Sequence, residues 1–326
     1  MDFCPSVYEH AARVIGRTPW EVSRDGELLA QGHIEAFRLY SHRPVVVGID
    51  IYNLEAEAYG ATVQRASGGG IPAITRPFCP HVADVLRLEP FDSCTAGRIP
   101  MILEAARAVA RACPQADVRV PVAGPFSVAA NLAGLEGVVS AVADRPDLVK
   151  AVLRHLVDGQ IRFCRAIRDG GLGVALFESA AAPPLLSPRQ FREIELPALQ
   201  TMLPQVAAIT GAPAAFIMGG DTALIVDAML ETGSGYICCP AETDQPAFMR
   251  AMQSHPEVAV RINMDPRPMV AGDLDLIRKE VDRVLALAQN RPRACIGTGV
   301  LPFEVDPQTV LQTRQMVLSR TVQGIA

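Results

Sequence analysis

The sequence has 326 residues, of which 49% are hydrophobic and 20% are charged, and its formal net charge is −5. This balance is typical of a globular chain with a large core, and a negative charge without any Lys/Arg run argues against a nucleic-acid partner. No apolar run approaches the ~20 residues that cross a bilayer, and the first residues lack a signal-peptide pattern, so we expect a cytoplasmic protein without a membrane partner.

Seven short apolar runs rich in β-branched residues alternate along the chain with longer helical patterns. Such alternation is typical of repeated βα units that form a parallel sheet. We expect an eighth strand within the glycine-containing stretch 63–75. The seven runs cover residues 45–50, 118–124, 173–179, 214–220, 235–240, 258–265 and 294–299.

Helix-start signals lie between these runs. Ser187, Pro188 and Gln190 have the spacing of an N-cap, a first-turn proline and a capping-box partner, and Asp306-Pro307 repeats the signal before the last helix. No glycine fingerprint of a dinucleotide-binding fold follows the first run, so the pattern favours a (β/α)8 TIM barrel over a doubly wound sheet. We predict one domain over residues 1–326, with a short helical cap at 1–44 and the barrel at 45–316.

Polar residues follow several of the predicted strands, where the chemistry of such barrels is found. Asp50, Glu178 and Asp221 are the catalytic candidates, because a carboxylate at a strand end can donate, accept or stabilise charge. Each could instead cap the helix that follows it. The residues expected to contact a substrate in the barrel mouth are Tyr52, Asn53, Phe126, Asn131, Ser179, Met218, Asn263 and Thr298.

The stretch "AFIMGGDTA", residues 215–223, ends an apolar run at two glycines and an acid. It is not a phosphate loop, because the required Lys is missing and Asp221 would repel an anion. It contains no His or Cys that could bind zinc. Gly219 and Gly220 more plausibly allow a tight turn and a close backbone approach to a ligand.

Six segments together resemble the uroporphyrinogen decarboxylase superfamily, which contains the porphyrinogen decarboxylase and the corrinoid-dependent methyltransferases. The resemblance covers about residues 45–316 and implies a barrel of the type already predicted. The segments are "VVVGIDIYNLEAEAYGA" (45–61), "VAGPFSVAANLAG" (122–134), "LFESAAAPPLLSPRQFREIELPAL" (176–199), "AFIMGGDTA", "RINMDPRPMVAG" (261–272) and "GTGVLPFEVDPQTV" (297–310).

The family's functional residues are retained only in part. Asp50 resembles the decarboxylase's catalytic Asp, and Ser179 resembles the Ser of its "FES" segment. Asn131 stands where the decarboxylase has a Tyr, Thr298 where it has a His, and Arg24 is the one trace of its arginine-rich N-terminal stretch. A porphyrinogen with many carboxylates is therefore a poor match for this chain.

The thiol-directed methyltransferases of the superfamily bind zinc through His-x-Cys and a further Cys, and all three positions differ here. The resemblance aligns them with Ile217, Gly219 and Thr298. In those enzymes zinc deprotonates the acceptor thiol, so the chain lacks the means of forming a thiolate, and we expect no zinc. Cys79 with His81, or Cys238 with Cys239, could supply donors, but their spacing favours structural thiols.

Three functions remain open at this point. We favour a corrinoid-dependent methyltransferase component that binds a non-thiol small molecule and acts with cobalamin on a separate corrinoid protein, because "GIDIYNLEAEAYGA" resembles that branch more than the decarboxylase. The first alternative is a metal-independent decarboxylase of a small organic acid that uses Asp50. The second is a non-catalytic subunit that binds a small molecule or a corrinoid protein.

Overall fold

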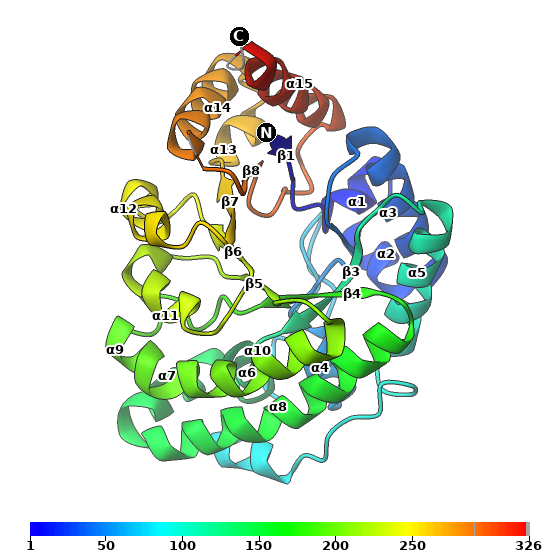
Figure 1. Ribbon diagram of the computed structural model, residues 1–326. Coiled ribbons are helices and arrows are strands. Elements are labelled where there is room, and N and C mark those ends of the chain that lie inside the picture. The colour runs from blue at the N-terminus through cyan, green and yellow to red at the C-terminus, as the bar shows by residue number, and fades with distance from the viewer. Residues whose placement is uncertain (290, 324–326) are drawn as a thin grey trace.

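The computed structural model describes residues 1–289 and 291–323, and its centre is one curled sheet of eight parallel strands. The strands are hydrogen-bonded in the order β1-β8-β7-β6-β5-β4-β3-β2, and the helices pack around the outside (Figure 1), which is a TIM-barrel-like α/β architecture. The strands are β1 (Asp2–Phe3), β2 (Val45–Val46), β3 (Val118–Ala123), β4 (Gly173–Phe177), β5 (Ala215–Ile217), β6 (Tyr236–Cys239), β7 (Ala259–Asn263) and β8 (Ala294–Gly297).

The sheet has two ends. β1 pairs with β8 and β2 pairs with β3, but among the described residues no backbone ladder joins β1 to β2, so the predicted closed barrel is an open, strongly curled one. The seven predicted strands are confirmed in position. The prediction of an eighth strand at 63–75 is wrong: this stretch has only one antiparallel bridge, between Gln64 and Ala73, because consecutive glycines weaken strand formation.

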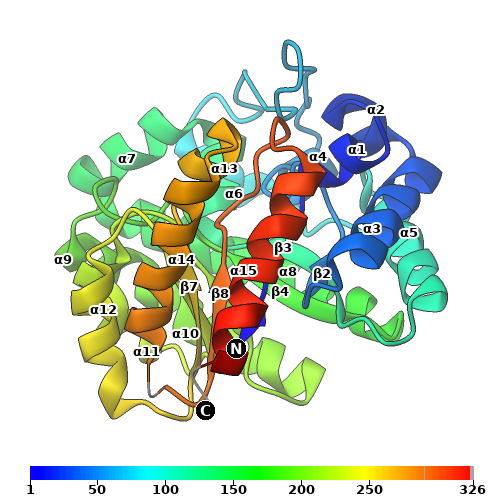
Figure 2. The same ribbon diagram turned by 90° about the horizontal axis from the view of Figure 1, so that it is seen from above.

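The N-terminal segment 1–44 differs from its predicted role as a cap. Its first residues form β1, inside the sheet, so the predicted barrel start at residue 45 is too late. Its helices join the outer helical layer, where α3 packs against α5 and α15 (Figure 2). The helices in question are α1 (His10–Val14), α2 (Pro19–Arg24), α3 (Gly26–Tyr40), α5 (Ile99–Ala112) and α15 (Pro307–Gln323).

The other helices follow the strands in the expected alternation. Ser187 caps the helix that begins at Pro188 and exchanges both capping-box bonds with Gln190, and the Asp306 carboxylate accepts from the Gln308 N–H at the start of α15, which confirms both predicted helix starts. The remaining α-helices are α4 (Leu54–Ala58), α6 (Pro125–Ala133), α7 (Leu135–Asp144), α8 (Pro146–Asp169), α9 (Pro188–Gln190), α10 (Leu196–Thr210), α11 (Val226–Leu230), α12 (Gln245–Ala251), α13 (Arg267–Ala271) and α14 (Leu274–Ala288). Residues 191–195 form a π-helical turn, and Val82–Arg87, Thr222–Ile225 and Met252–Ser254 form 3₁₀ helices.

The sheet separates two apolar regions, because successive side chains of a strand point to opposite faces. On β4, Leu176 belongs to the large core between sheet and helices, which we call the outer core. Phe177 belongs to a smaller cluster inside the curled sheet, the inner cluster, together with Tyr8, Ile217 and Cys238. This alternation decides which strand-end residues can face the mouth.

The described helices include none that is both long and apolar enough to span a membrane alone. Helices α6 and α7 reach the length and apolar composition of a membrane span only when they are taken together. They are bent by 112° relative to one another.

Candidate functional site

Three segments meet at the carboxyl ends of the strands around the Ser179 hydroxyl. Ser179 follows β4 on its inner face, and its Oγ lies 2.6 Å from the Tyr52 hydroxyl, which comes from the loop after β2. The Gly219 N–H, just after β5, donates to the same Oγ at 2.9 Å. The Asn131 amide donates to the Tyr52 carbonyl oxygen at 2.6 Å and fixes that loop from α6. We call Tyr52, Ser179 and Gly219 the mouth cluster.

The mouth cluster is neutral and polar. Burial raises the pKa of the Tyr52 phenol well above its usual value, so the hydroxyl keeps its proton and can donate a hydrogen bond. Tyr52 also packs edge-on against Phe177 of the inner cluster, with ring centroids 6.2 Å apart. Ser179 is only half-buried, so a polar atom of a substrate can reach this pair of hydroxyls.

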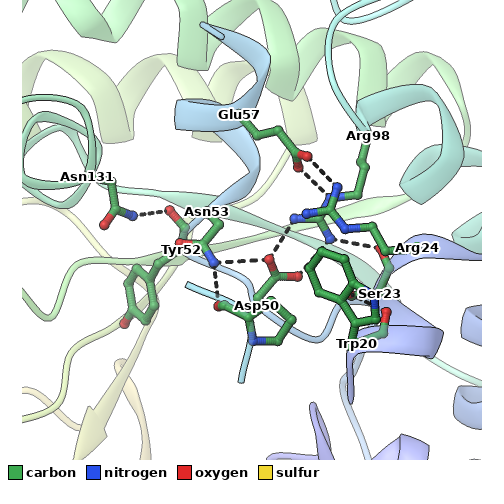
Figure 3. A network of polar contacts seen from close by, with 10 residues as sticks. Trp20, Ser23, Arg24, Asp50, Tyr52, Asn53, Glu57, Arg98 and Asn131 are labelled. Carbon is green, nitrogen blue, oxygen red and sulfur yellow. Dashed lines mark hydrogen bonds and ion pairs between the residues drawn. The ribbon is translucent and has the colours of Figure 1, made fainter. Parts of the chain in front are cut away.

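Asp50 lies close by in sequence but points away from this cluster, as Figure 3 shows. Its carboxylate is 1% exposed and accepts two bonds from the Arg98 guanidinium, Nη1 to Oδ1 at 2.8 Å and Nη2 to Oδ2 at 2.6 Å. The Asn53 amide donates to Oδ2 at 3.0 Å and also to the Pro72 carbonyl at 2.8 Å. Both oxygens of Asp50 are therefore engaged, and Asn53 is used to hold the loop.

A second carboxylate completes this ion-pair network. Glu57 on α4 accepts from Arg98 Nε and, at 2.5 Å, from Arg24 Nη1, while Arg24 stacks 4.7 Å above the Trp20 ring. Arg98 Nη1 also donates to the Ser23 carbonyl. Sequence reasoning missed Arg98, because it directly precedes α5 rather than ending a strand, and it belongs to no motif.

Glu178 was expected in the mouth, but the structure places it on the outer face of β4. The carboxylate accepts from the N–H groups of Phe126 and Ser127 and from the Ser127 hydroxyl, so it caps the N-terminus of α6. Phe126 and Met218 also belong to the outer core and are fully buried there, which corrects their predicted position in the mouth. Strand alternation explains the positions of Glu178 and Met218. Glu178 directly precedes Ser179 and Met218 directly precedes Gly219, and both following residues belong to the mouth cluster.

Two further buried carboxyls lie in the same outer layer. Burial, and then the nearby charge of Glu178, raise the pKa of Glu195 well above its usual value, and burial raises the pKa of Glu178 to about 7. Burial likewise raises the pKa of Glu55 on α4 to about 8. A carboxyl in such surroundings can bind a proton, which lowers the cost of its burial.

The remaining predicted residues lie around the rim or below it. The Asp221 carboxylate accepts from the Thr243 hydroxyl at 2.8 Å on the loop after β5. Thr298 is fully buried, and its hydroxyl donates to the Gly299 carbonyl at 3.0 Å. Asn263 ends β7 on the inner face and donates to Cys238 Sγ at 3.1 Å. The structure thus brings Tyr52 and Ser179 together directly and Asn131 through a backbone contact.

The residues do not fit a zinc site of the kind found in the thiol-directed methyltransferases. Ile217 packs in the inner cluster, Gly219 has no side chain, and Thr298 bonds to the backbone. Cys238 and Cys239 point to opposite faces of the sheet. Among the described residues, no group of three or more His, Cys, Asp or Glu side chains is arranged to hold a metal ion.

Comparison with known proteins finds one matching family model and similar methyltransferases. A family model described as uroporphyrinogen decarboxylase (URO-D) matches residues 4–317. Methylcobamide:CoM methyltransferase MtaA of Methanosarcina barkeri is 26% identical over 156 residues, which is 47% of this chain and 46% of that protein. The MtaA of M. barkeri strain Fusaro / DSM 804 is 25% identical over 156 residues. The chain thus spans about half the length of the curated relatives that it matches.

A solved structure extends the likeness to the whole chain. A methyltransferase from Methanosarcina mazei superposes with a TM-score of 0.82 and covers 100% of this chain and 94% of its own, at 19% identity. At this identity the superposition shows that the two proteins share a fold.

Proposed function

Because the chain belongs to the uroporphyrinogen decarboxylase family, we propose that it is a methyltransferase component that works with a separate corrinoid protein and binds a non-thiol small molecule in its mouth. The match to methylcobamide:CoM methyltransferases supports the reaction class. A cobalamin on the partner protein would supply the cobalt that gives or accepts the methyl group. This chain would supply the site that holds and orients the small molecule.

The observation that carries the proposal is the mouth cluster. Where the resemblance to thiol-directed relatives would put zinc ligands, this chain has Ile217, Gly219 and Thr298, and the Gly219 N–H is turned to the Ser179 hydroxyl. Two adjacent hydroxyls can hydrogen-bond an ether, hydroxyl or amine, whereas they cannot replace a metal that deprotonates a thiol. The substrate is therefore a molecule whose methylated atom is oxygen or nitrogen.

The position of Asp50 supports methyl transfer over decarboxylation. A decarboxylase of this family would use Asp50 on its substrate, yet here both carboxylate oxygens accept bonds from Arg98. Opening this pair would leave a buried guanidinium without its partner, which is strongly unfavourable. We infer that Asp50 positions the loop that carries Tyr52.

Methyl exchange with free cobalamin tests the proposal. The purified protein is mixed with reduced cobalamin and a panel of methoxy and methylamino compounds, or with methylcobalamin and the demethylated compounds, and methylcobalamin is measured by absorbance and mass spectrometry. We expect exchange with at least one compound. Ser179→Ala should lower the rate by about 10²-fold, because a hydrogen-bond donor at the reacting group is lost.

Other results would point to the other functions. Stoichiometric CO2 release from a small acid, without methyl exchange, would replace the proposal with decarboxylation. Capture of a corrinoid protein without either reaction would make the chain a non-catalytic subunit.

A further inference from the structure

Arg261 lies in the middle of β7 with its side chain on the inner face of the sheet, and it is only 5% exposed. The strand register places it beside Cys238 of β6 and Cys295 of β8. Phe177 and Ile217 line the same interior. A guanidinium cannot lose its proton in a protein, so a permanent positive charge is buried among thiols, phenols and apolar side chains.

This charge has no carboxylate partner in the described part of the chain. The one side-chain acceptor within hydrogen-bonding range of Arg261 is Cys238 Sγ, 3.7 Å from Nη2. Burial raises the pKa of the Cys238 thiol, so that sulfur is neutral. Arg261 Nε is buried and has no partner. Buried charges are normally paired, so an unpaired guanidinium indicates a missing anion.

Two more polar atoms near Arg261 lie on β6 and β7. The Tyr236 hydroxyl, two residues before Cys238 on β6, is buried, and its one polar partner is the Cys295 thiol. Oδ1 of Asn263, one inner-face position after Arg261 on β7, is buried without a partner. Buried polar groups are rarely left unsatisfied, and the Arg261 Nε and the Asn263 Oδ1, both on β7, together point to a ligand.

The Arg261 stem runs toward the mouth rather than away from it. A Cβ added to Gly297 would lie 2.6 Å from Cδ and 2.8 Å from Cγ of Arg261. Gly297 lies two residues after Cys295 and is the last residue of β8. The Arg261 stem therefore lies against the carboxyl end of that strand. The place of a Gly297 side chain is taken by the Arg261 stem and the Asn263 amide, and Gly219 adds no side chain beside the Ser179 hydroxyl.

We propose that Arg261 binds the carboxylate of a small organic acid that enters from the mouth. A carboxylate matches the guanidinium with two parallel hydrogen bonds, and the Tyr236 hydroxyl on the neighbouring strand is a further donor. One negative charge neutralises one buried positive charge, whereas a phosphate dianion would leave a net charge in the interior. The apolar body of the acid lies against Phe177 and Ile217. The inference rests on the proposed function, since it takes the mouth as the substrate site.

A competing source of negative charge is the Cys295 thiolate. A hydrogen bond from Cys4 lowers the pKa of Cys295 more than burial raises it, and the Arg261 charge lowers it further. If this thiolate neutralised Arg261, the interior would need no ligand. The two cases differ in whether carboxylates bind and in how fast Cys295 is alkylated.

Binding of matched acids and amides, measured without cobalamin, tests the inference. The probes are acetate, hexanoate, benzoate and phenylacetate and their amides, and binding is measured by calorimetry and thermal shift. We expect at least one acid to bind about tenfold or more tightly than its amide. Arg261→Met should remove this preference and leave amide binding unchanged, and Arg261→Lys should keep part of it. Circular dichroism checks that both variants fold.

Arg24 provides the matched control. Its Nε and Nη2 are also buried without partners, but its Nη1 is paired with Glu57, so Arg24→Met should retain acid binding. The inference is overturned if no acid of the panel binds better than its amide, if Arg261→Met keeps the preference, or if only Arg24→Met loses it. Rapid alkylation of Cys295 that Arg261→Met abolishes, with no effect of acids, would assign the charge to the thiolate. Since no cobalamin is present, failure of methyl transfer leaves this result unaffected.

Discussion

Two arginines of this chain are almost equally buried, Arg98 at 7% and Arg261 at 5% exposed, but they occupy opposite electrostatic situations. Arg98 bonds to two carboxylates, Asp50 and Glu57, and to a backbone carbonyl. Arg261 has one neutral sulfur as its partner. The first charge is balanced by carboxylates of the chain, whereas the second has no carboxylate partner among the described residues.

The outer core shows a third way of burying a charged group. Glu55, Glu178 and Glu195 have no cation among their main interactions, but a carboxyl can bind a proton and become neutral. A guanidinium has no such option. An unpaired buried Arg therefore indicates a ligand more strongly than an unpaired buried Glu does.

The largest effect is expected from Arg98→Met. It leaves the buried Asp50 carboxylate without its cation, whereas Glu57 keeps Arg24, and breaking such a buried pair typically lowers the free energy of unfolding by about 3–5 kcal/mol. Urea unfolding followed by circular dichroism measures the change. Arg111→Met on the same helix is the control, because its exposed ion pair with Glu104 should contribute little. A loss of less than about 1 kcal/mol for Arg98→Met would mean that the network is not stabilising.

Glu55 is expected to make the free energy of unfolding depend on pH, by about 2 kcal/mol. Its pKa is about 8 in the folded chain and ordinarily 4.5, so the folded state holds a proton that the unfolded state has released. The stabilisation is complete below pH 4.5 and is lost as the pH rises through 8. Between about pH 6.5 and 8 the free energy of unfolding should fall by about 2 kcal/mol. Urea titrations across this range measure the fall.

Glu55→Gln is the control for this pH dependence. Its neutral amide should remove about 2 kcal/mol of the decline above pH 6.5, and the remainder belongs to Glu9, Glu178 and Glu195, whose pKa values burial also raises. An unchanged slope would assign the whole decline to those groups. The range starts at 6.5 because burial lowers the pKa of His10 and His33 to about 4 and of His42 to about 3. Those histidines contribute stability that is lost as the pH falls below 6.5, so they do not affect the alkaline range.

A smaller effect is expected from the neutral pair in the mouth cluster. Tyr52→Phe removes the 2.6 Å contact with Ser179 and should lower the free energy of unfolding by about 1 kcal/mol. A double-mutant cycle with Ser179→Ala measures the coupling, which we expect to be about 1 kcal/mol. Additive losses would show that the two hydroxyls do not interact in solution.

The smallest effect on unfolding is expected from Arg261→Met without ligand. Replacing an unpaired buried charge by an apolar side chain of similar length is often neutral or stabilising, so the change should stay within about 1 kcal/mol of zero or raise the stability. The same urea experiment as for Arg98→Met makes the comparison direct. A loss as large as that of Arg98→Met would show that Arg261 is already neutralised within the chain.

The strand pattern was predictable because seven strands carry apolar, β-branched runs of at least the usual length. β1 was not, since two residues, Asp2 and Phe3, cannot show a periodic pattern. The mistake over Glu178 was avoidable: alternation from the inward Phe177 assigns Ser179 to the mouth and Glu178 to the helices.

The arginines show the limit of reading a site from strand ends. The pairing of Asp50 with Arg98 joins residues separated by 48 positions, and no local signal records it. Arg261 did leave a signal, because a charged residue in the middle of the apolar run "VAVRIN" is unusual for a buried strand. The metal prediction remains a prediction until the protein is analysed for zinc.

Among the described residues no ladder joins β1 to β2, and this opening has a mechanical consequence. In a closed barrel, any change of diameter strains hydrogen bonds around the whole circumference. A curled sheet with two unpaired ends can change its curvature without breaking hydrogen bonds between its strands. The helices between β1 and β2 in the chain, which include α1 and α3, then limit how far the two sheet ends can move apart. α1 and α3 approach closely there, since a Cβ on Gly32 would lie 3.0 Å from the Ala11 carbonyl oxygen. A methyl group added at Gly32 would therefore act as a spacer that alters the width of the opening from a remote position.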